Sequence, residues 1–295
     1  MAFLLFLSVF LSILFWAYGN RQSFSFPLKI PKTAILSSPS PTPTPTPKID
    51  PAEGIKKEIS NLTKDLKGEY GIYVYNLTTR EGFGIKENEV FTAASINKLP
   101  VILTLYQEAE AGRLDLETKY ALLAQDKRGG AGSMQYKPLG TVYTYRQMVE
   151  LMAKQSDNTA FAALRRILTD EKIQDVIDNL GMKKTSLKES LTSPSDIGLF
   201  FRKFYSGSLL SRKNRDEIIG FLTKTAFEDR IPAGLPAGTA VAHKIGSEIG
   251  VVSDAGIVFS PKPYILVILS KDVNEKEALT VLPKISRAVW EFENK

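Results

Sequence analysis

Cysteine is absent from the 295 residues, and histidine occurs only once, at His243. Without cysteine the chain can form no disulfide, thiolate zinc site, thiol nucleophile or lipidated N-terminal cysteine. A single histidine excludes most histidine-rich metal sites, and it makes a Ser-His-Asp triad depend on one residue. We therefore expect neither a bound metal nor another cofactor.

The chain also has only a small excess of positive charge. It contains 38 Lys plus Arg and 32 Asp plus Glu, which gives a formal net charge of +6. This mild excess suits contact with an anionic envelope polymer or a membrane surface. It is too small and too scattered to predict nucleic-acid binding. With 43% apolar and 24% charged residues, the chain has ordinary globular composition. Its length suffices for one large or two modest cores.

Only one long apolar run stands out, AFLLFLSVFLSILFWAY at residues 2–18. Such a run is an export signal or a membrane anchor. No Lys or Arg precedes it, so we expect residues 1–20 to be an uncleaved anchor. Cleavage near the small residues Ala17 and Gly19 is the alternative, and it would release the protein.

A proline-rich segment follows, reading SSPSPTPTPTPK at residues 37–48. Alternating Thr-Pro favours extended polyproline conformations. The sequence therefore predicts a semi-rigid stalk over residues 21–48 and a globular domain over residues 49–295. The apolar leader and the stalk together place that domain outside the cytoplasm.

Strand patterns occur at both ends of the globular part. Period-two alternation from Glu69 and the turn near Thr78 predict a hairpin that ends at Ile85. Further strands are expected at residues 240–245, 251–259 and 264–269, followed by an amphipathic helix over residues 274–293 with a kink at Pro283.

Helical signals fill the middle of the chain. Thr144 and Gln147 form a capping box, Gly181 follows a helical pattern over residues 171–180, and Ser193 begins a helix that Gly207 ends. We predict an α/β fold of the α+β type. One antiparallel sheet would come from residues 49–93 and 225–295, and an all-helical lobe from residues 94–224 would be inserted. A cleft between the lobes is the expected place for a site.

The candidate catalytic pair is Ser95 and Lys98, in FTAASINKLP at residues 91–100. On a helix, a spacing of three puts both side chains on one face, so the amine can reach the hydroxyl. A lysine whose pKa is lowered by burial and by a second cation can take the serine proton. Taken alone, the pair is a weak signal, because serine and lysine are common and such a pair is more often a helix N-terminal serine with a solvated lysine.

Two more segments have ordinary structural explanations when each is taken alone. QSDNTA at residues 155–160 suits a helix N-cap, and AHKIGS at residues 242–247 suits an edge-like strand with a surface lysine. All three segments occur in order behind an export leader. The chain thus resembles the class A β-lactamase and penicillin-binding protein family, whose signature is S-x-x-K, S-D-N and K-T-G. The resemblance covers residues 49–295, including GGAGSMQYKPLG at residues 129–140 and EDRIPAGLPAG at residues 228–238.

The resemblance implies a β-lactamase/transpeptidase-like fold and a role for each matching residue. Ser95 would be the acylated nucleophile and Lys98 its base, while Ser156 would pass a proton to the leaving nitrogen. Asn158 would hold the amide of the substrate's side chain, and Lys244 would attract its carboxylate. Gly246 would let the strand approach closely, and the backbone N–H groups of Ser95 and Ser247 would form an oxyanion hole.

Two departures from the family pattern affect function. Ile245 stands where the family has Thr or Ser, and it cannot donate a hydrogen bond to a carboxylate. The segment GMKKTSLKESLTSP at residues 181–194 is short, and its only acid, Glu189, lacks the E-x-x-L-N setting of the water-activating glutamate. We expect acylation to outrun hydrolysis, since general-base assistance is worth roughly 10²- to 10⁴-fold.

His243 directly precedes Lys244, and strand alternation directs it away from Ser95, so we expect it to pack rather than catalyse. The leading hypothesis is a serine hydrolase acting on β-lactams or related amides through an acyl-enzyme on Ser95. One alternative is a D-alanyl-D-alanine peptidase or esterase of cell-wall metabolism with a peptidoglycan-like substrate. Another is a non-catalytic, stalk-mounted binding module, which Ile245 and the missing glutamate would favour.

Overall fold

The computed structural model describes residues 51–295. The predicted anchor (residues 1–20) and stalk (residues 21–48) lie outside the described residues. Between residues 51 and 295, no helix is both long and apolar enough to cross a membrane.

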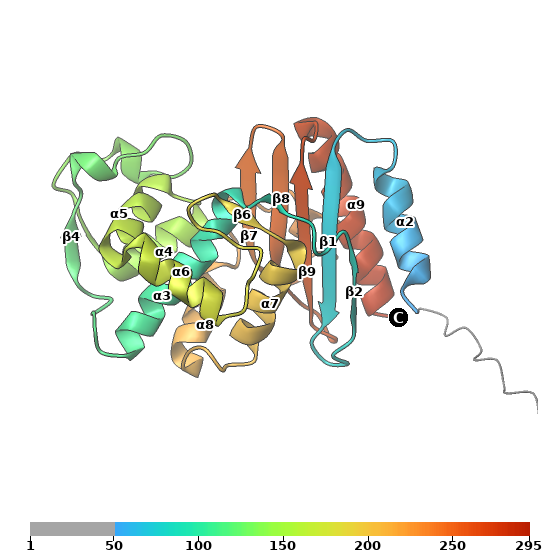
Figure 1. Cartoon of the computed structure of the whole chain (residues 1–295), viewed down its shortest axis with the longest axis horizontal. Coiled ribbons are helices and arrows are strands. Elements are labelled where there is room, and N and C mark those ends of the chain that lie inside the picture. The colour runs from blue at the N-terminus through green and yellow to red at the C-terminus, as the bar shows by residue number, and fades with distance from the viewer. Residues whose placement is uncertain (1–50) are drawn as a thin grey trace, which may run out of the picture. The chain divides into compact units, whose positions relative to one another are not determined.

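A five-stranded antiparallel sheet in the order β2-β1-β9-β8-β7 is the centre of the fold (Figure 1). Its strands come from two distant parts of the chain: β1 (Glu69–Asn76), β2 (Gly82–Ile85), β7 (Ala240–Glu248), β8 (Val251–Phe259) and β9 (Tyr264–Lys271). The predicted hairpin and the three later strands are confirmed, and β7 is an edge strand. Strands β8 and β9 are buried almost throughout, which is typical of strands covered on both faces.

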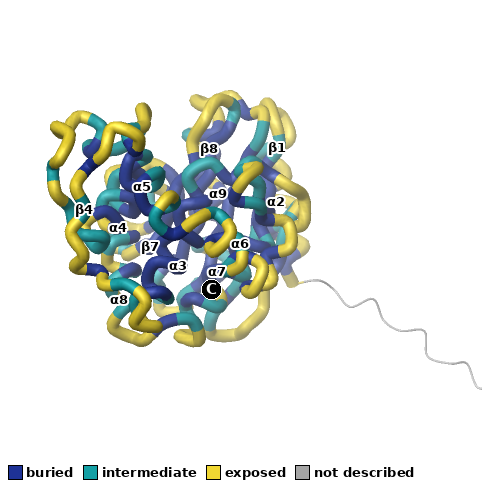
Figure 2. Tube along the Cα trace, turned by 60° about the vertical axis from the view of Figure 1, so that its left-hand side comes forward, coloured by how far each residue is buried: buried dark blue, intermediate teal, exposed yellow. Residues whose placement is uncertain are grey.

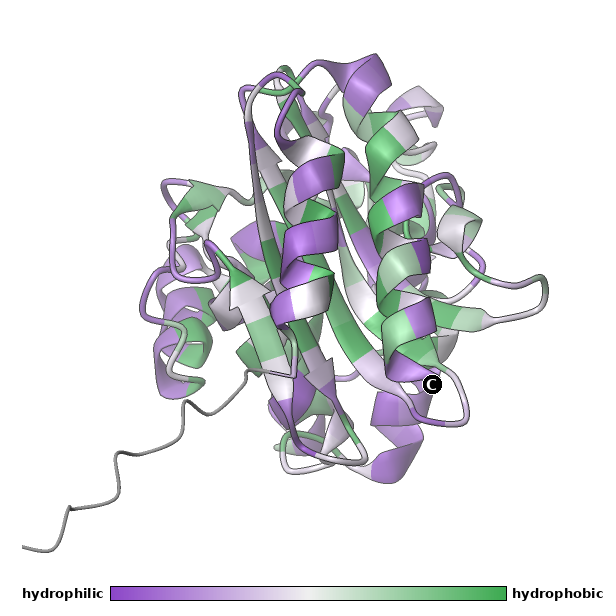
Figure 3. Cartoon of the chain, turned by 90° about the vertical axis from the view of Figure 1, so that its right-hand side faces the viewer, coloured by the Kyte–Doolittle hydropathy of each residue, from purple (hydrophilic) through white to green (hydrophobic). Residues whose placement is uncertain are grey.

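Helices cover the two faces of the sheet. Two of them, α2 (Glu53–Thr63) and α9 (Glu275–Glu293), lie against one face. Seen from that side, they expose hydrophilic residues interspersed with apolar ones (Figure 3). The remaining helices come from the middle of the chain: α3 (Lys98–Glu110), α4 (Tyr145–Lys154), α5 (Asn158–Leu168), α6 (Asp170–Asn179), α7 (Pro194–Tyr205) and α8 (Arg212–Phe221).

Two hydrophobic cores result, one on each side of the sheet. The larger joins the helices of the middle segment to the inner face of the sheet, around residues such as Tyr106 and Phe201. The smaller lies under α2 and α9, around Ile72 and Leu282. Figure 2 shows the central strands and α3 as largely buried tube, with the exposed segments at the periphery. The predicted fold class is confirmed.

Local signals placed several helix ends correctly. The capping box of Thr144 and Gln147 begins α4, and the Ser193 side chain caps α7. The last helix runs from Glu275 to Glu293 and contains Pro283.

Some short elements were not predicted. They are α2, the paired strands β3 (Phe91–Thr92) with β6 (Leu191–Thr192) and β4 (Lys119–Ala121) with β5 (Val142–Thr144), and the 3₁₀ turns η1 (Ala94–Asn97), η2 (Ala124–Asp126), η3 (Met134–Tyr136) and η4 (Pro232–Gly234). The middle segment is therefore mainly helical but also contains small sheets.

Candidate active site

Ser95 lies in the 3₁₀ turn η1, and Lys98 is the first residue of α3. The expectation of one continuous helix through both residues is thus wrong in detail. The 3₁₀ turn nevertheless keeps the two side chains together, since residues three apart eclipse one another in this conformation. The Lys98 Nζ–H donates to Ser95 Oγ over 2.9 Å. Ala94, just before the serine, has a φ of 46°, a conformation that costs energy for a residue with a Cβ.

Lys98 is held by the second motif as well as by Ser95. Its Nζ lies 3.1 Å from Ser156 Oγ, 2.6 Å from the Ser156 carbonyl oxygen and 2.7 Å from Asn158 Oδ1. With Ser95 Oγ, four oxygen atoms surround Lys98 Nζ, but a protonated lysine has only three N–H groups to donate. A neutral amine can instead accept a hydrogen bond from one of the hydroxyl groups through its lone pair. The arrangement can therefore accommodate the neutral form.

Lys98 is only 2% exposed, and this burial favours the neutral form of its amine. Loss of solvent lowers the pKa of Lys98 to about 7, although the negative charge of Asp157 opposes this effect. Near neutral pH, a large fraction of Lys98 is thus a free base within hydrogen-bond distance of Ser95 Oγ.

Ser156 bridges the two lysines. Lys244 Nζ donates to Ser156 Oγ over 2.9 Å, and Lys98 Nζ lies 3.1 Å from the same oxygen. Burial lowers the pKa of Lys244 well below its ordinary value, and the nearby Lys98 lowers it further. Ser156 has a φ of 55° and is fully buried. This strained residue sits in the chain turn that brings the hydroxyl between two amines.

Asn158 begins α5, directly after Asp157, whose carboxylate caps the helix by accepting the Ala160 N–H at 2.8 Å. Asn158 Nδ2 donates to the Gly129 carbonyl oxygen over 2.9 Å. A Cβ at Gly130 would lie 2.8 Å from that amide nitrogen, and a Cβ at Gly132 would collide with the Asp157 carboxylate. The glycines of GGAGSM thus allow this loop to lie against the second motif.

The edge strand β7 brings the third motif to η1. A Cβ at Gly246 would lie 2.9 Å from the Ala93 carbonyl oxygen, so only glycine fits without displacement of the strand or the turn. Ser247 is exposed, whereas Ile245 is 4% exposed. The three predicted segments therefore meet around Ser95, as the family resemblance implies.

A functional residue that our reading of the sequence missed is Arg230, which we had treated as part of the EDRIPAGLPAG framework. Its Nη2 donates to Ser247 Oγ over 2.6 Å, and its Nη1 donates to the Gly246 carbonyl oxygen over 3.1 Å. The residue is 5% exposed. Arg230 thus supplies a cation at the end of the third motif, where Ile245 supplies no hydroxyl. Arg230 lies 14 residues before Lys244 and 17 residues before Ser247, and no helix or strand periodicity indicates a contact over such a separation.

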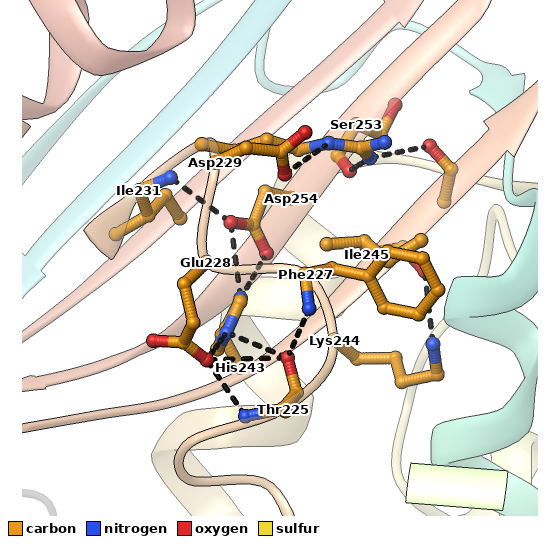
Figure 4. A network of polar contacts seen from close by, with 12 residues as sticks. Thr225, Phe227, Glu228, Asp229, Ile231, His243, Lys244, Ile245, Ser253 and Asp254 are labelled. Atoms are coloured by element: carbon orange, nitrogen blue, oxygen red, sulfur yellow. Dashed lines mark hydrogen bonds and ion pairs between the residues drawn. The ribbon is translucent and has the colours of Figure 1, made fainter. Parts of the chain in front are cut away.

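His243 is buried on the other side of β7 and does not contact Ser95. It donates from Nδ1 to Asp254 Oδ1 over 2.8 Å and from Nε2 to Glu228 Oε1 over 3.3 Å (Figure 4). Burial opposes its charge, but Asp254 and then Glu228 outweigh that effect and raise the pKa of His243 to about 9. The expected packing role is consistent with this geometry. The ion pair joins β7 and β8 to the segment that carries Arg230.

Glu189 lies in the short segment 181–194 and is exposed, and its backbone N–H donates to Ser186 Oγ. Within the described residues, no carboxylate is among the hydrogen-bond partners of Lys98 or Ser95. The segment reaches the site through Ser190 instead, whose carbonyl oxygen accepts the Ala93 N–H at 2.7 Å and whose hydroxyl accepts from Asn97. Glu189 thus forms no hydrogen bond with the serine–lysine pair.

The fold and this site define a class of enzyme, a serine hydrolase that uses lysine rather than histidine next to its serine. The chain belongs to the β-lactamase enzyme family, whose sequence profile matches residues 54–292. Beta-lactamase VEB-1 of Pseudomonas aeruginosa is 21% identical over 274 residues, covering 81% of this chain and 90% of that protein. The extended-spectrum beta-lactamase PER-1 of the same species is 22% identical, with 82% and 88% covered.

Solved structures agree with the fold. PBP-A is 27% identical with a TM-score of 0.77, and the match covers 82% of this chain and 97% of PBP-A. A mutant of PBP-A, also 27% identical, has been solved as an acyl-enzyme complex with penicillin G. A beta-lactamase from Sphaerobacter thermophilus has a TM-score of 0.78 at 24% identity, covering 82% and 98%. The predicted family is confirmed, and the chain is a β-lactamase-like serine hydrolase.

Proposed function

We propose that Ser95 attacks the carbonyl carbon of a β-lactam and forms an acyl-enzyme. Neutral Lys98 takes the proton of Ser95 Oγ as the Oγ–C bond forms. The C–N bond of the lactam then breaks, and the nitrogen receives a proton from Ser156, which is replenished by the lysines on either side. The product is an ester on Ser95, and the ring-opened amine remains attached to it.

Two further groups stabilise the charges of this reaction. The backbone N–H groups of Ser95 and Ser247 receive the negative charge that develops on the carbonyl oxygen, and one such donor is worth about 3 kcal/mol. Lys244 and Arg230 attract the substrate carboxylate toward the end of β7. Arg230 thereby binds the substrate carboxylate in place of a hydroxyl group at position 245, where this chain has isoleucine.

Release of the acyl group is expected to be slow. Hydrolysis needs a group that activates water, and Glu189 is exposed and forms no hydrogen bond with the serine–lysine pair. The similarity to PBP-A, a mutant of which was solved as an acyl-enzyme complex with penicillin G, supports an acyl-enzyme as the intermediate. The chain is thus proposed to react quickly with penicillins and to turn them over slowly.

One observation carries the proposal: a buried lysine with a pKa of about 7 lies 2.9 Å from the serine hydroxyl. A binding module would gain nothing from burying two lysines around two hydroxyls, because each desolvated amine costs stability. This argues against the non-catalytic alternative.

Stopped-flow mixing with a chromogenic cephalosporin tests the proposal. We expect a burst of one equivalent per protein molecule, followed by slow steady turnover. Fast turnover without a burst would show efficient hydrolysis, and no reaction at all would contradict the proposed nucleophile.

We also infer a location outside the cytoplasm, with residues 2–18 as the membrane anchor. The apolar run and the Thr-Pro segment of the sequence support this inference. Protease added to intact cells should remove the domain, and it should leave a cytoplasmic marker protein uncut. Complete protection of the domain in intact cells, with digestion after lysis, would contradict it.

A further inference from the structure

A hollow opens on the outer side of α5, next to the catalytic residues. Its lining comes from three segments: the loop at Arg128 and Gly129, helix α5, and Asp170 at the start of α6. The residues that matter for its chemistry are Arg128, Asn158, Phe161, Arg165, Arg166 and Asp170. None of the proposed catalytic steps uses this space.

Two residues of this lining also contact the catalytic lysine. Asn158 accepts from Lys98 Nζ at 2.7 Å. The ring of Phe161 lies with its centroid 5.5 Å from Lys98 Nζ and 5.9 Å from the guanidinium carbon of Arg165. One aromatic ring therefore separates the catalytic lysine from the arginines of the hollow.

The lining is rich in cations, three arginines against one carboxylate. Arg165 forms a two-point ion pair with Asp170, and Arg166 donates to Asp126 Oδ1 over 3.1 Å. Arg128 differs, because its Nη1 donates only to the carbonyl oxygens of Gln125 and Lys127, and no ion pair joins it to a carboxylate of the described residues. Arg128 is exposed, so its charge is available to a ligand.

The short segment 181–194 leaves this face of α5 open. It contributes no residue to the lining of the hollow. Its contacts go elsewhere: Leu187 N–H donates to Gln174 Oε1 over 3.0 Å, and Ser190 contacts Asn97 and Ala93. The space beside Asn158 is therefore not filled by segment 181–194.

We propose that this hollow binds the acyl side chain of the substrate and selects side chains that end in a carboxylate, with Arg128 as the anchoring cation. The inference rests on the proposed function, since the side chain reaches the hollow only when its carbonyl lies at Ser95. Phe161 packs against the carbon chain of the ligand, Asn158 holds its amide, and the arginines attract its terminal charge. The substrate class is an amide or β-lactam with an acidic acyl side chain.

A matched pair of penicillins tests this proposal on the full-length protein. One carries an adipyl side chain with a free carboxylate, and the other is its side-chain monomethyl ester, which differs by one charge. The rate of Ser95 acylation is measured for each, and their ratio cancels effects on catalysis itself. A partly exposed ion pair contributes up to about 1 kcal/mol, so we expect the acid to react about five-fold faster than the ester.

The variant Arg128→Gln should bring this ratio close to one, and raising the salt concentration should lower it in the wild type. The control is Arg287→Gln, an exposed arginine on α9 at the opposite face of the sheet, which should keep the wild-type ratio. Equal rates for acid and ester in the wild type, or a ratio that survives Arg128→Gln, would overturn the proposal. Failure of the proposed function looks different, because neither penicillin would then acylate the protein.

Discussion

Two amines around two hydroxyls dominate the chemistry at the scale of single residues. Lys98 and Lys244 flank Ser156 at 3.1 and 2.9 Å, and both are almost fully buried. Burial lowers the pKa of both lysines, and the charge of Lys98 lowers the pKa of Lys244 further. This explains how the chain activates a serine although its one histidine lies elsewhere.

The first prediction concerns the pH dependence of acylation. Because Lys98 must be neutral to accept the Ser95 proton, the acylation rate should rise with pH through an apparent pKa near 7. At pH 5 the rate should be about one hundredth of the alkaline plateau, since two pH units below the pKa about 1% of the amine is free. Stopped-flow acylation from pH 5 to pH 9 measures this profile. A flat profile, with acylation shown to be limiting, would rule out Lys98 as the base.

The second prediction concerns Glu189. Replacing it by Gln keeps the shape and removes the charge, and the exposed side chain forms no hydrogen bond with the serine–lysine pair. Deacylation should therefore change less than three-fold, against the 10²-fold or more of a lost general base. Single-turnover release of a penicilloyl group reports this step alone. A collapse of release with unchanged acylation would assign the water-activating role to Glu189 after all.

The sequence predicted much of the site because its chemistry is local. Ser95 and Lys98 are three residues apart, and Ser156, Asp157 and Asn158 are consecutive. Their meeting with Lys244 could be foreseen only through the family resemblance, since no periodicity encodes a contact across 88 positions. Arg230 was missed for the same reason, because its partner Ser247 lies 17 residues away on a strand.

Close approach between β7 and η1 is the main constraint at the scale of elements. The third prediction is that Gly246→Ala impairs acylation, because the added Cβ would lie 2.9 Å from the Ala93 carbonyl oxygen and 3.4 Å from Ile96 Cγ1. Overpacking of this kind costs about 1–3 kcal/mol and shifts the strand against the Ser95 turn. Acylation rates and urea unfolding, measured together, separate the two effects.

A matched glycine on α8 provides the control. A Cβ at Gly220 would meet nothing within 4 Å. Gly220→Ala should leave acylation unchanged and raise the free energy of unfolding by up to about 1 kcal/mol, because alanine favours a helix. Equal acylation in both variants would show that the approach of β7 does not limit the reaction.

Elements with a strong period were predictable and short ones were not. The alternation in β1 and the continuous apolar runs of β8 and β9 identified the sheet. Helix α2 was missed because it buries only Ile55 and Ile59 over 11 residues. Strands of two or three residues, such as β3 and β4, contain too few positions for any period to appear.

At the scale of the whole molecule, the buried ion pair of His243 and Asp254 links the site's edge strand to the rest of the sheet. The fourth prediction is a dependence of stability on pH that requires this histidine. The pKa of His243 is about 9 in the folded protein against 6.5 for the ordinary group. Because the folded protein binds the His243 proton more tightly than the unfolded chain does, protonation of His243 stabilises the fold. This stabilisation has its full size below pH 6.5 and is lost as the pH rises through 9.

Urea unfolding of the wild type and of His243→Gln at several pH values measures this contribution. The stability difference between the two should shrink between pH 6.5 and 9.5 by up to about 3 kcal/mol, which follows from 1.36 kcal/mol per pKa unit. The lowered pKa values of Lys98 and Lys244 make stability depend on pH in the opposite direction. Both lysines are present in the wild type and in the variant, so their contribution cancels in the difference. A constant difference across this range would show that His243 is neutral in the folded protein.

The central claim, that Ser95 is the nucleophile, is tested most directly by intact-protein mass spectrometry after mixing with penicillin G. The account predicts that the wild type gains the mass of one whole penicillin molecule, because ring opening expels no atoms, and that the adduct maps to the peptide containing Ser95. Ser95→Ala should fold normally and gain no mass, since only one small hydroxyl is lost. An adduct that persists on Ser95→Ala, or a wild type that neither forms an adduct nor hydrolyses the penicillin, would contradict the account.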